Sequence, residues 1–108
     1  PRQVIITDSD IREAIMPSIL SLVDGIKEVL ETTPPELLSD IMNRGLILSG
    51  GGALLRGFNT LLSSALKIPV YVSEDPLTAV ARGTGVILDD LESFQEVLVN
   101  TDDTSTPR

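Results

Sequence analysis

Apolar residues recur at three- and four-residue steps through residues 11–30, and this spacing predicts one long amphipathic helix. Polar residues 7–10 precede it and offer side chains that can cap its first turn. Pro17 lies inside the pattern, so we expect either a kink or a break into two pieces. A β-branched run at residues 4–7 favours a short strand before the helix. The predicted apolar face consists of Ile11, Ile15, Ile19, Leu22, Ile26, Val29 and Leu30.

A second helix and two short strands are expected next. The sequence TTPP at residues 32–35 ends the first helix, and residues 36–42 predict a short helix that begins on a proline and ends before Gly45. Residues 46–48 are apolar without alternation, which is expected of a strand covered on both faces. Residues 69–73 predict another strand.

Each of these strands is followed by a predicted helix. Asp75 can cap a helix that has Pro76 at its first position and extends to Leu91. The alternation of strands and helices implies an α/β fold, with a short parallel or mixed sheet and helices packed on it. The other helix covers residues 53–66, and its inward positions are Leu54, Leu55, Phe58, Leu61 and Leu62.

Composition narrows the classes of function. The 108 residues allow one domain at most, and 42% hydrophobic residues are enough for it to fold. The net charge of −8 argues against nucleic acid as a partner, because phosphate binding depends on clusters of Lys and Arg. The chain has no cysteine and no histidine, so disulfides, thiol chemistry and the commonest general base are excluded.

The two ends of the chain, and its longest apolar stretches, allow further predictions. No apolar stretch approaches the roughly 20 residues of a membrane span, and no signal sequence opens the chain, so we expect an intracellular segment without membrane insertion. It begins at Pro1 rather than at methionine, which favours a piece of a longer protein. Residues 93–108 are expected to form a C-terminal tail, polar and disordered from Asn100. An amphipathic stretch before that point is expected to pack on the chain's own sheet: Leu91, Phe94, Val97 and Leu98.

Three consecutive glycines form the strongest candidate site, within the sequence LILSGGGALLRG at residues 46–57. Without Cβ atoms, a ligand can approach the main chain closely there, and a helix opening at Ala53 would offer free N–H groups to a phosphate or a ribose. The end of a parallel strand is also where ligands bind in such sheets. The pattern is neither a Walker A loop nor a dinucleotide fingerprint. A plain tight turn remains the alternative.

Several charged residues could bind a metal ion or a ligand, but for most of them an ordinary structural role is favoured. Asp8 and Asp10 are expected to be helix caps rather than metal ligands. Arg56 is expected in a surface salt bridge rather than on a phosphate. Arg82, followed by Gly-Thr-Gly, marks either a ligand-facing helix or a close helix contact. The acidic residues of the last helix are expected to form a solvated face: Asp89, Asp90 and Glu92.

Longer motifs resemble the C-terminal region of the MreB family of bacterial actin homologues. The resemblance covers roughly residues 4–91 and includes TTPPEL, DIMNRGLILSGGGALLRG, IPVYV and DPLTAVARGTG, in this order. It implies that residues 1–92 are part of an actin-like ATPase domain of the ribonuclease H-like type. It further implies that a nucleotide contacts the glycine turn, and the implied contacts are Gly50, Gly51, Gly52, Ala53 and Leu54.

The resemblance also implies what the intact protein does. Members of the family bind ATP or ADP with Mg²⁺, polymerise into filaments beneath the inner membrane in the cytoplasm, and organise wall synthesis with membrane-associated proteins. The family's acidic phosphate loops have no match here, so no catalytic or metal-binding residue is expected in this chain. Two alternatives stay open: a stand-alone α/β interaction module with a closed surface over the glycines, and a piece of another actin-fold ATPase, such as a sugar kinase or a heat-shock ATPase.

Overall fold

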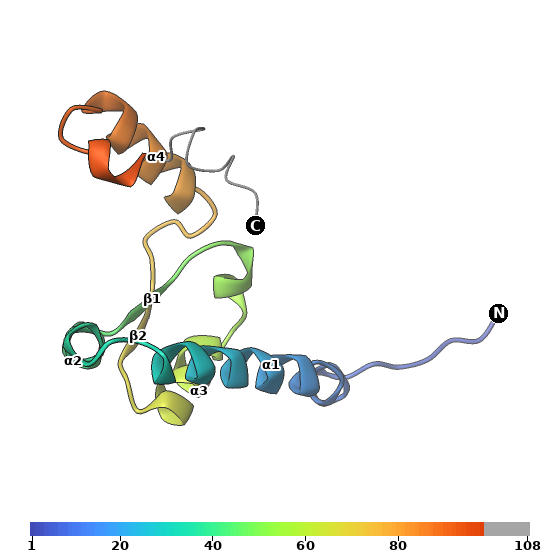
Figure 1. The fold of residues 1–108 in the computed structure, drawn as a ribbon. Helices are drawn as coiled ribbons and strands as arrows, with labels where there is room; N and C mark the ends of the chain where they lie inside the picture. Colours follow the sequence, from blue (N-terminus) through green and yellow to red (C-terminus); the bar gives the residue numbers. More distant parts are fainter. Residues whose placement is uncertain (99–108) are drawn as a thin grey trace, which may run out of the picture.

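A computed structural model describes residues 1–98, and Figure 1 shows their arrangement. The two strands form one parallel sheet, and each is followed by helical structure. In chain order the elements are α1 (Asp8–Glu31), α2 (Pro35–Arg44), β1 (Leu46–Leu48), the 3₁₀ helix η1 (Gly51–Leu54), α3 (Phe58–Leu66), β2 (Val70–Val72), α4 (Ala79–Asp89) and the 3₁₀ helix η2 (Gln95–Val97). The predicted α/β fold with a short parallel sheet and packed helices is confirmed. The expected disorder from Asn100 lies outside the described residues.

Helix α1 begins with the capping residues that the sequence offered. The Thr7 N–H donates to Asp10 Oδ2 at 2.9 Å, and the Asp10 N–H donates to Thr7 Oγ1 at 3.3 Å, which together make a capping box. Pro17 does not divide the helix, so of the two expected effects, a kink or a break, the break is wrong. A proline removes one backbone hydrogen bond, and 14 further helical residues, including the buried Ile19 and Val23, continue beyond it.

The strand predicted at residues 4–7 is wrong. Residues 1–7 have no regular secondary structure, and Ile5 is 91% exposed. Figure 1 shows this segment extending away from the rest of the chain. A strand needs a neighbour to satisfy its N–H and C=O groups, and no strand within residues 1–98 lies beside this one.

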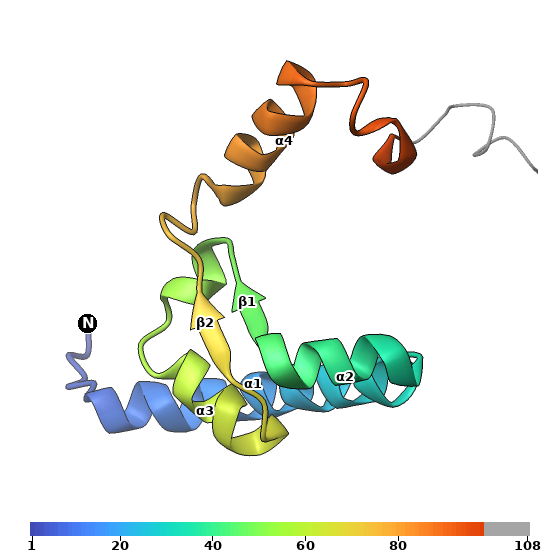
Figure 2. The same cartoon turned by 90° about the vertical axis from the view of Figure 1, so that its left-hand side faces the viewer.

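Strands β1 and β2 pair in parallel, with Leu46 opposite Val70 and Leu48 opposite Val72. The pairing extends past both ends, because the Leu46 N–H donates to Pro69 O and the Ser73 N–H donates to Leu48 O, each at 2.8 Å. Both strands therefore end at the same edge of the sheet, as Figure 2 shows. The turns that follow them start side by side.

The hydrophobic core lies between the sheet and two helices. Helix α3 packs against β2, and α1 packs against α3. Val23, Leu62 and Val70 form its buried centre, and Leu62 has no exposed surface. The surrounding side chains come from all these elements and include Ile26, Leu46, Leu48, Phe58, Leu61 and Leu66.

Only one face of the sheet is covered in the described chain, so the expectation of two covered faces for β1 is wrong. Leu46 and Leu48 are half-buried, whereas Ile47 is 72% exposed. On β2, Tyr71 is also exposed. Side chains of adjacent strand residues point to opposite faces, and residues 1–98 place helices against one face alone.

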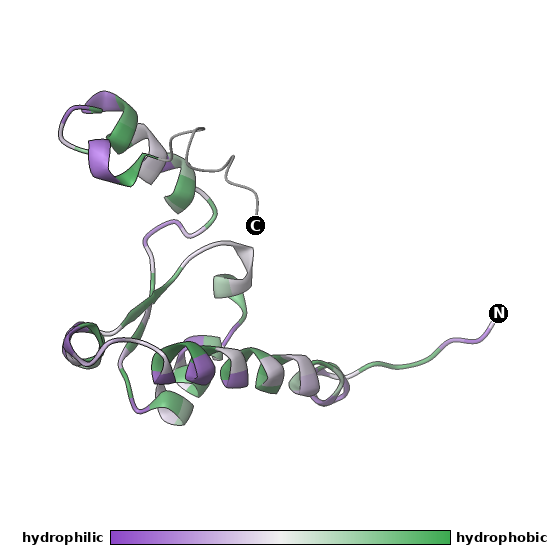
Figure 3. Cartoon of the chain, viewed as in Figure 1, coloured by the Kyte–Doolittle hydropathy of each residue, from purple (hydrophilic) through white to green (hydrophobic). Residues whose placement is uncertain are grey.

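The C-terminal part of the described chain stands apart from the core. Figures 1 and 2 show α4 and η2 away from β1 and β2, so the expected packing of residues 91–98 on the sheet is wrong. Figure 3 shows hydrophobic residues along α4, and Val80 and Leu88 are both exposed. These residues have the apolar pattern of a buried surface, but the described residues supply nothing that covers them.

Gly45 sets the entry into β1, and replacing it with alanine should destabilise the fold. Its φ of 89° disfavours any side chain, and an added Cβ would lie 2.6 Å from Pro69 O and 2.9 Å from Tyr71 Cε2. We expect Gly45→Ala to cost roughly 3 kcal/mol or more of unfolding free energy, measured by urea denaturation of the chain. Gly83→Ala, where the added Cβ meets nothing within 4 Å, is the matched control. An equal effect of both substitutions would contradict this role for Gly45.

The capping box should make the start of α1 sensitive to acid. The Thr7 N–H, and next the Thr7 hydroxyl, lower the pKa of the Asp10 carboxyl below its usual value of 3.8. A lowered pKa in the folded state means that the contribution to stability is present above the unfolded pKa and is lost as pH falls through the folded pKa. We expect NMR titration to give Asp10 a lower midpoint than in Thr7→Ala. Equal midpoints would show that the Thr7 hydroxyl does not lower the pKa of the Asp10 carboxyl, since Thr7→Ala keeps the backbone N–H.

Candidate functional site

The glycine turn connects β1 to η1 at the carboxyl edge of the sheet. Gly50 has φ 83° and ψ 176°, a conformation open almost only to glycine. Gly51 and Gly52 do not have positive φ values. The backbone of this turn therefore requires glycine at the first of the three positions alone.

Residues 53–66 do not form the single helix that was predicted. Ala53 lies within η1, and a new helix, α3, begins only at Phe58, after Gly57 in a left-handed conformation. Ala53 is buried, as are Leu62 and, in part, Phe58 and Leu61, but Leu54 and Leu55 are exposed, so their predicted inward placement is wrong. Leu54 ends η1, Leu55 is extended, and Gly57 is left-handed, so Leu54 and Leu55 do not continue the inward face of α3.

The N–H groups of the turn fall into two kinds. The Gly50 N–H donates to Pro76 O at 2.8 Å, and the Ala53 N–H donates to Gly50 O at 3.2 Å. Among residues 1–98, no backbone acceptor is found for the N–H groups of Gly51 and Gly52. Both glycines are exposed. Two neighbouring backbone donors thus lie on exposed residues where no Cβ obstructs a ligand.

A second turn, residues 73–78, lies against the glycine turn. It follows β2 as the glycine turn follows β1, and it supplies the Pro76 carbonyl that Gly50 binds. A Cβ built on Gly51 would lie 3.6 Å from Leu77 Cδ2, so this side chain lies beside the second glycine. The buried Ser73 Oγ has no hydrogen-bond partner among the described residues.

The predicted helix start at Pro76 is wrong. Helix α4 begins at Ala79, and Thr78 is its N-cap residue without a side-chain capping bond. Asp75 has a positive φ of 47° and lies in the turn instead of capping the helix. The turn is held by contacts of its backbone with the glycine turn and with Arg82, which local sequence preferences do not reveal.

Arg82 binds the turn that precedes its own helix. Its guanidinium donates to Thr78 Oγ1 and to the carbonyl oxygens of Glu74 and Asp75. A Cβ built on either Gly83 or Gly85 would meet nothing within 4 Å, so these glycines do not mark close packing against other described residues. Sequence reasoning had noted Arg82 but missed its acceptors, since they are mostly backbone atoms.

The described acidic residues do not gather into a metal site. Within the described part of the chain, no group of three or more His, Cys, Asp or Glu side chains could hold a metal ion. Asp10 takes part in the capping box, as expected. Asp89, Asp90 and Glu92 are exposed, and Asp90 Oδ1 accepts a hydrogen bond from the Ser93 N–H at 3.3 Å.

A groove of about 620 Å³ lies between the first half of α1 and the start of α3. Arg12 and Arg56 lie on its walls with apolar side chains such as Ile15 and Phe58. The three glycines are not among its lining residues, so the groove and the glycine turn are separate features. In the part of the structure that is described, none of the helices is long and apolar enough to span a bilayer.

The sequence matches a known family along most of its length. Residues 1–96 match the family model described as MreB/Mbl protein. The chain is 48% identical over 94 residues to the cell shape-determining protein Mbl of Bacillus subtilis (strain 168), a match that covers 87% of this chain and 28% of that protein. It is 47% identical over 89 residues to the cell shape-determining protein MreB of Escherichia coli (strain K12), covering 82% of this chain and 26% of that protein. The chain thus spans little more than a quarter of the length of these curated relatives.

Two solved structures share the fold. They are crystal structures of MreB5 of Spiroplasma citri, one bound to ADP and one bound to AMPPNP. Each is similar with a TM-score of 0.81 at 31% identity, over 89% of this chain and 29% of the MreB5 chain. The arrangement of α1, the parallel strands and the glycine turn therefore has a close counterpart in nucleotide-bound proteins.

Substitution of single glycines should show which of them the backbone conformation of the turn requires. We expect Gly50→Ala to lower the unfolding free energy by about 1–3 kcal/mol, because alanine is strained at its φ and ψ. Gly52→Ala should change it by less than about 0.5 kcal/mol, because the added Cβ has no neighbour within 4 Å. Urea denaturation of both variants tests this difference. Equal losses would mean that the turn has a different backbone from the one described.

Proposed function

The chain belongs to the MreB/Mbl family, and we propose that in the complete protein it forms one wall of a nucleotide pocket. Its fold is part of the actin-like ATPase fold found in MreB5. The proposed contacts are the residues of the glycine turn and of η1: Gly50, Gly51, Gly52, Ala53 and Leu54.

One observation carries the proposal: the fold of this chain does not account for glycine at positions 51 and 52. Neither residue has a positive φ, and an added Cβ would meet an ordinary van der Waals contact at Gly51 and open space at Gly52. Close approach of a ligand to the main chain explains why Cβ atoms are absent there. The N–H groups of both glycines, which have no backbone acceptor within residues 1–98, would donate to that ligand.

The ligands named for the MreB5 structures have the acceptors that the proposed contacts need. ADP and AMPPNP, named for the MreB5 structures, carry phosphate and ribose oxygens that accept hydrogen bonds from backbone N–H groups. Gly50 shapes the turn, and buried Ala53 anchors it to the core. Leu54, which is 57% exposed, offers an apolar surface beside the donors.

We assign a binding role to this segment and no step of hydrolysis. A nucleotide phosphate chain in such a protein carries Mg²⁺ on carboxylates and water, and the described acidic side chains are not grouped to supply them. The groups that would bind Mg²⁺ and orient a water molecule are therefore proposed to come from the remainder of the protein, since the chain spans 28% of its relative Mbl.

The complete protein is proposed to act as a cell-shape determinant. Relatives from Bacillus subtilis and Escherichia coli bear that name. We propose that it binds ATP or ADP, self-associates into filaments in the cytoplasm beneath the inner membrane, and works with membrane-associated wall-synthesis proteins. The interaction-module alternative required a closed surface over the glycines, and the exposure of Gly51 and Gly52 does not favour it.

The experiment compares ADP binding by the full-length protein and its Gly52→Ala variant, by isothermal titration calorimetry. We expect the added methyl group to weaken ADP binding about tenfold or more, which corresponds to about 1.4 kcal/mol. The melting temperature without nucleotide should stay unchanged, because the methyl group has space in the fold.

Gly83→Ala is the matched control, since it adds the same methyl group on α4, where no described residue outside this helix lies within 4 Å of the added Cβ. Its ADP affinity should equal that of the unmodified protein. If Gly52→Ala bound ADP as tightly as this control, the glycine turn would not contact the nucleotide.

A further inference from the structure

Arg82 makes the side-chain hydrogen bonds that tie α4 to the turn before it. Its Nε donates to Thr78 Oγ1 at 3.0 Å. Its Nη2 donates to the carbonyl oxygen of Glu74 and, at 3.3 Å, to that of Asp75. All three acceptors lie between β2 and α4, so one guanidinium binds both ends of this connection.

The connection held by Arg82 is the one that contacts the glycine turn. Pro76 lies between the acceptors of Arg82, and its carbonyl oxygen accepts the Gly50 N–H at 2.8 Å. The side chain of Leu77 lies beside Gly51. If residues 74–78 relaxed, the Gly50 N–H would lose its acceptor, and the glycine turn would lose a support on the side away from β1.

The local conformational preferences of residues 74–78 favour the observed shape of this connection only weakly. Asp75 has a φ of 47°, which is uncommon for a residue with a side chain. Thr78 does not cap α4 with its side chain; instead its N–H and its hydroxyl both donate to Asp75 O, at 3.1 and 3.3 Å. The hydrogen bonds from Arg82 supply the additional constraint that keeps the Pro76 carbonyl directed at Gly50.

The geometry of these bonds calls for arginine. A guanidinium presents several N–H donors in one rigid plane, so Nε and Nη2 can bind a hydroxyl and two carbonyl oxygens together. A lysine ammonium is a single point on a flexible stem and cannot reproduce this arrangement. Charge alone would therefore not replace Arg82.

We propose that Arg82 is a positioning residue for the glycine turn, acting through the carbonyl of Pro76 on the N–H of Gly50. Arg82 itself need not touch a nucleotide. By holding residues 74–78, it keeps the N–H groups of Gly51 and Gly52 oriented toward the ligand. The effect on nucleotide affinity rests on the proposed function, whereas the effect on the Gly50 hydrogen bond does not.

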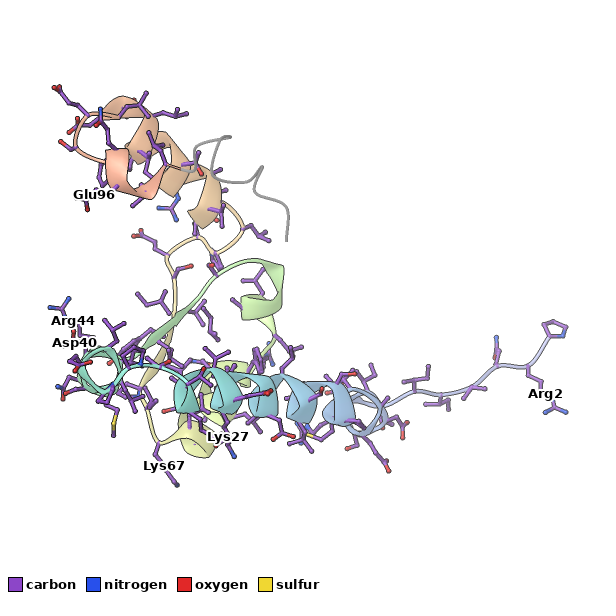
Figure 4. The ribbon with its side chains drawn as sticks, in the orientation of Figure 1. Arg2, Lys27, Asp40, Arg44, Lys67 and Glu96 are labelled. Atoms are coloured by element: carbon purple, nitrogen blue, oxygen red, sulfur yellow. The ribbon has the colours of Figure 1, made fainter. Side chains whose placement is uncertain are left out.

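The test uses the full-length protein with Arg82→Met and Arg82→Lys, and with Arg44→Met as the matched control. Arg44 ends α2, and Figure 4 shows its side chain well apart from α4. Amide hydrogen exchange is measured at Gly50 without nucleotide, residue by residue, by NMR. The Ser73 amide, which donates to Leu48 O at 2.8 Å, reports on the sheet in the same sample. ADP affinity is measured by calorimetry.

We expect the Gly50 amide to exchange about tenfold faster in both Arg82 variants, with Ser73 unchanged, because only the turn loosens. ADP affinity should fall roughly fivefold in both, and Arg44→Met should match the unmodified protein. Equal Gly50 exchange in Arg82→Met and the unmodified protein would overturn the inference and leave the proposed function standing. Full recovery in Arg82→Lys would also overturn it, since charge alone would then suffice.

Two further results distinguish a failure of the proposed function from a failure of the inference about Arg82. If the unmodified protein bound no ADP, the proposed function would fail, and the Gly50 exchange rate would still decide whether Arg82 holds the turn. If Arg82→Met loosened the core amide of Leu62 as well, Arg82→Lys would replace it, because a lysine keeps the charge and the aliphatic stem but cannot bind all three acceptors together. A faster Gly50 amide in Arg82→Lys, with Leu62 unchanged, supports the inference, and an unchanged Gly50 amide overturns it.

Discussion

The parallel pairing of β1 and β2 is the constraint on which the rest of the structure depends. Because Leu48 lies opposite Val72, both strands end at one edge of the sheet, and the turns after them meet. Gly45 permits this register, since any Cβ at its position would collide with the Pro69 carbonyl. The hydrogen bond from Gly50 to Pro76 then joins the two turns. The outward N–H groups of the glycine turn are a consequence of this arrangement.

Elements with strong local signals could be predicted from the sequence. The threonine cap and the apolar spacing gave α1, TTPP separated it from α2, and two short apolar runs gave β1 and β2. The helix starts at Ala53 and Pro76 were predicted wrongly, because these two segments are shaped by each other. The positive φ of Asp75 and the Pro76–Gly50 bond depend on contacts between residues some 26 positions apart.

Other predictions failed because the pattern describes an environment larger than this chain. The apolar run at residues 4–7, the outer face of β1 and the stretch at residues 91–98 all have the composition of buried structure, yet apart from the half-buried Phe94 they are exposed. The chain spans 28% of the length of its relative Mbl. Apolar residues evolve to suit the surfaces they meet in the whole protein, so the sequence retains a pattern that these residues cannot satisfy by themselves.

The candidate site shows what sequence and structure each contribute. Three consecutive glycines are equivalent in the sequence, and family resemblance assigned all of them to the nucleotide. The structure divides them: Gly50 is required by its own backbone conformation, whereas Gly51 and Gly52 have ordinary conformations and space for a side chain. A glycine that the fold does not need calls for an explanation outside the fold. Exposed N–H groups at the start of η1 provide one, because a ligand can replace the water that otherwise satisfies them.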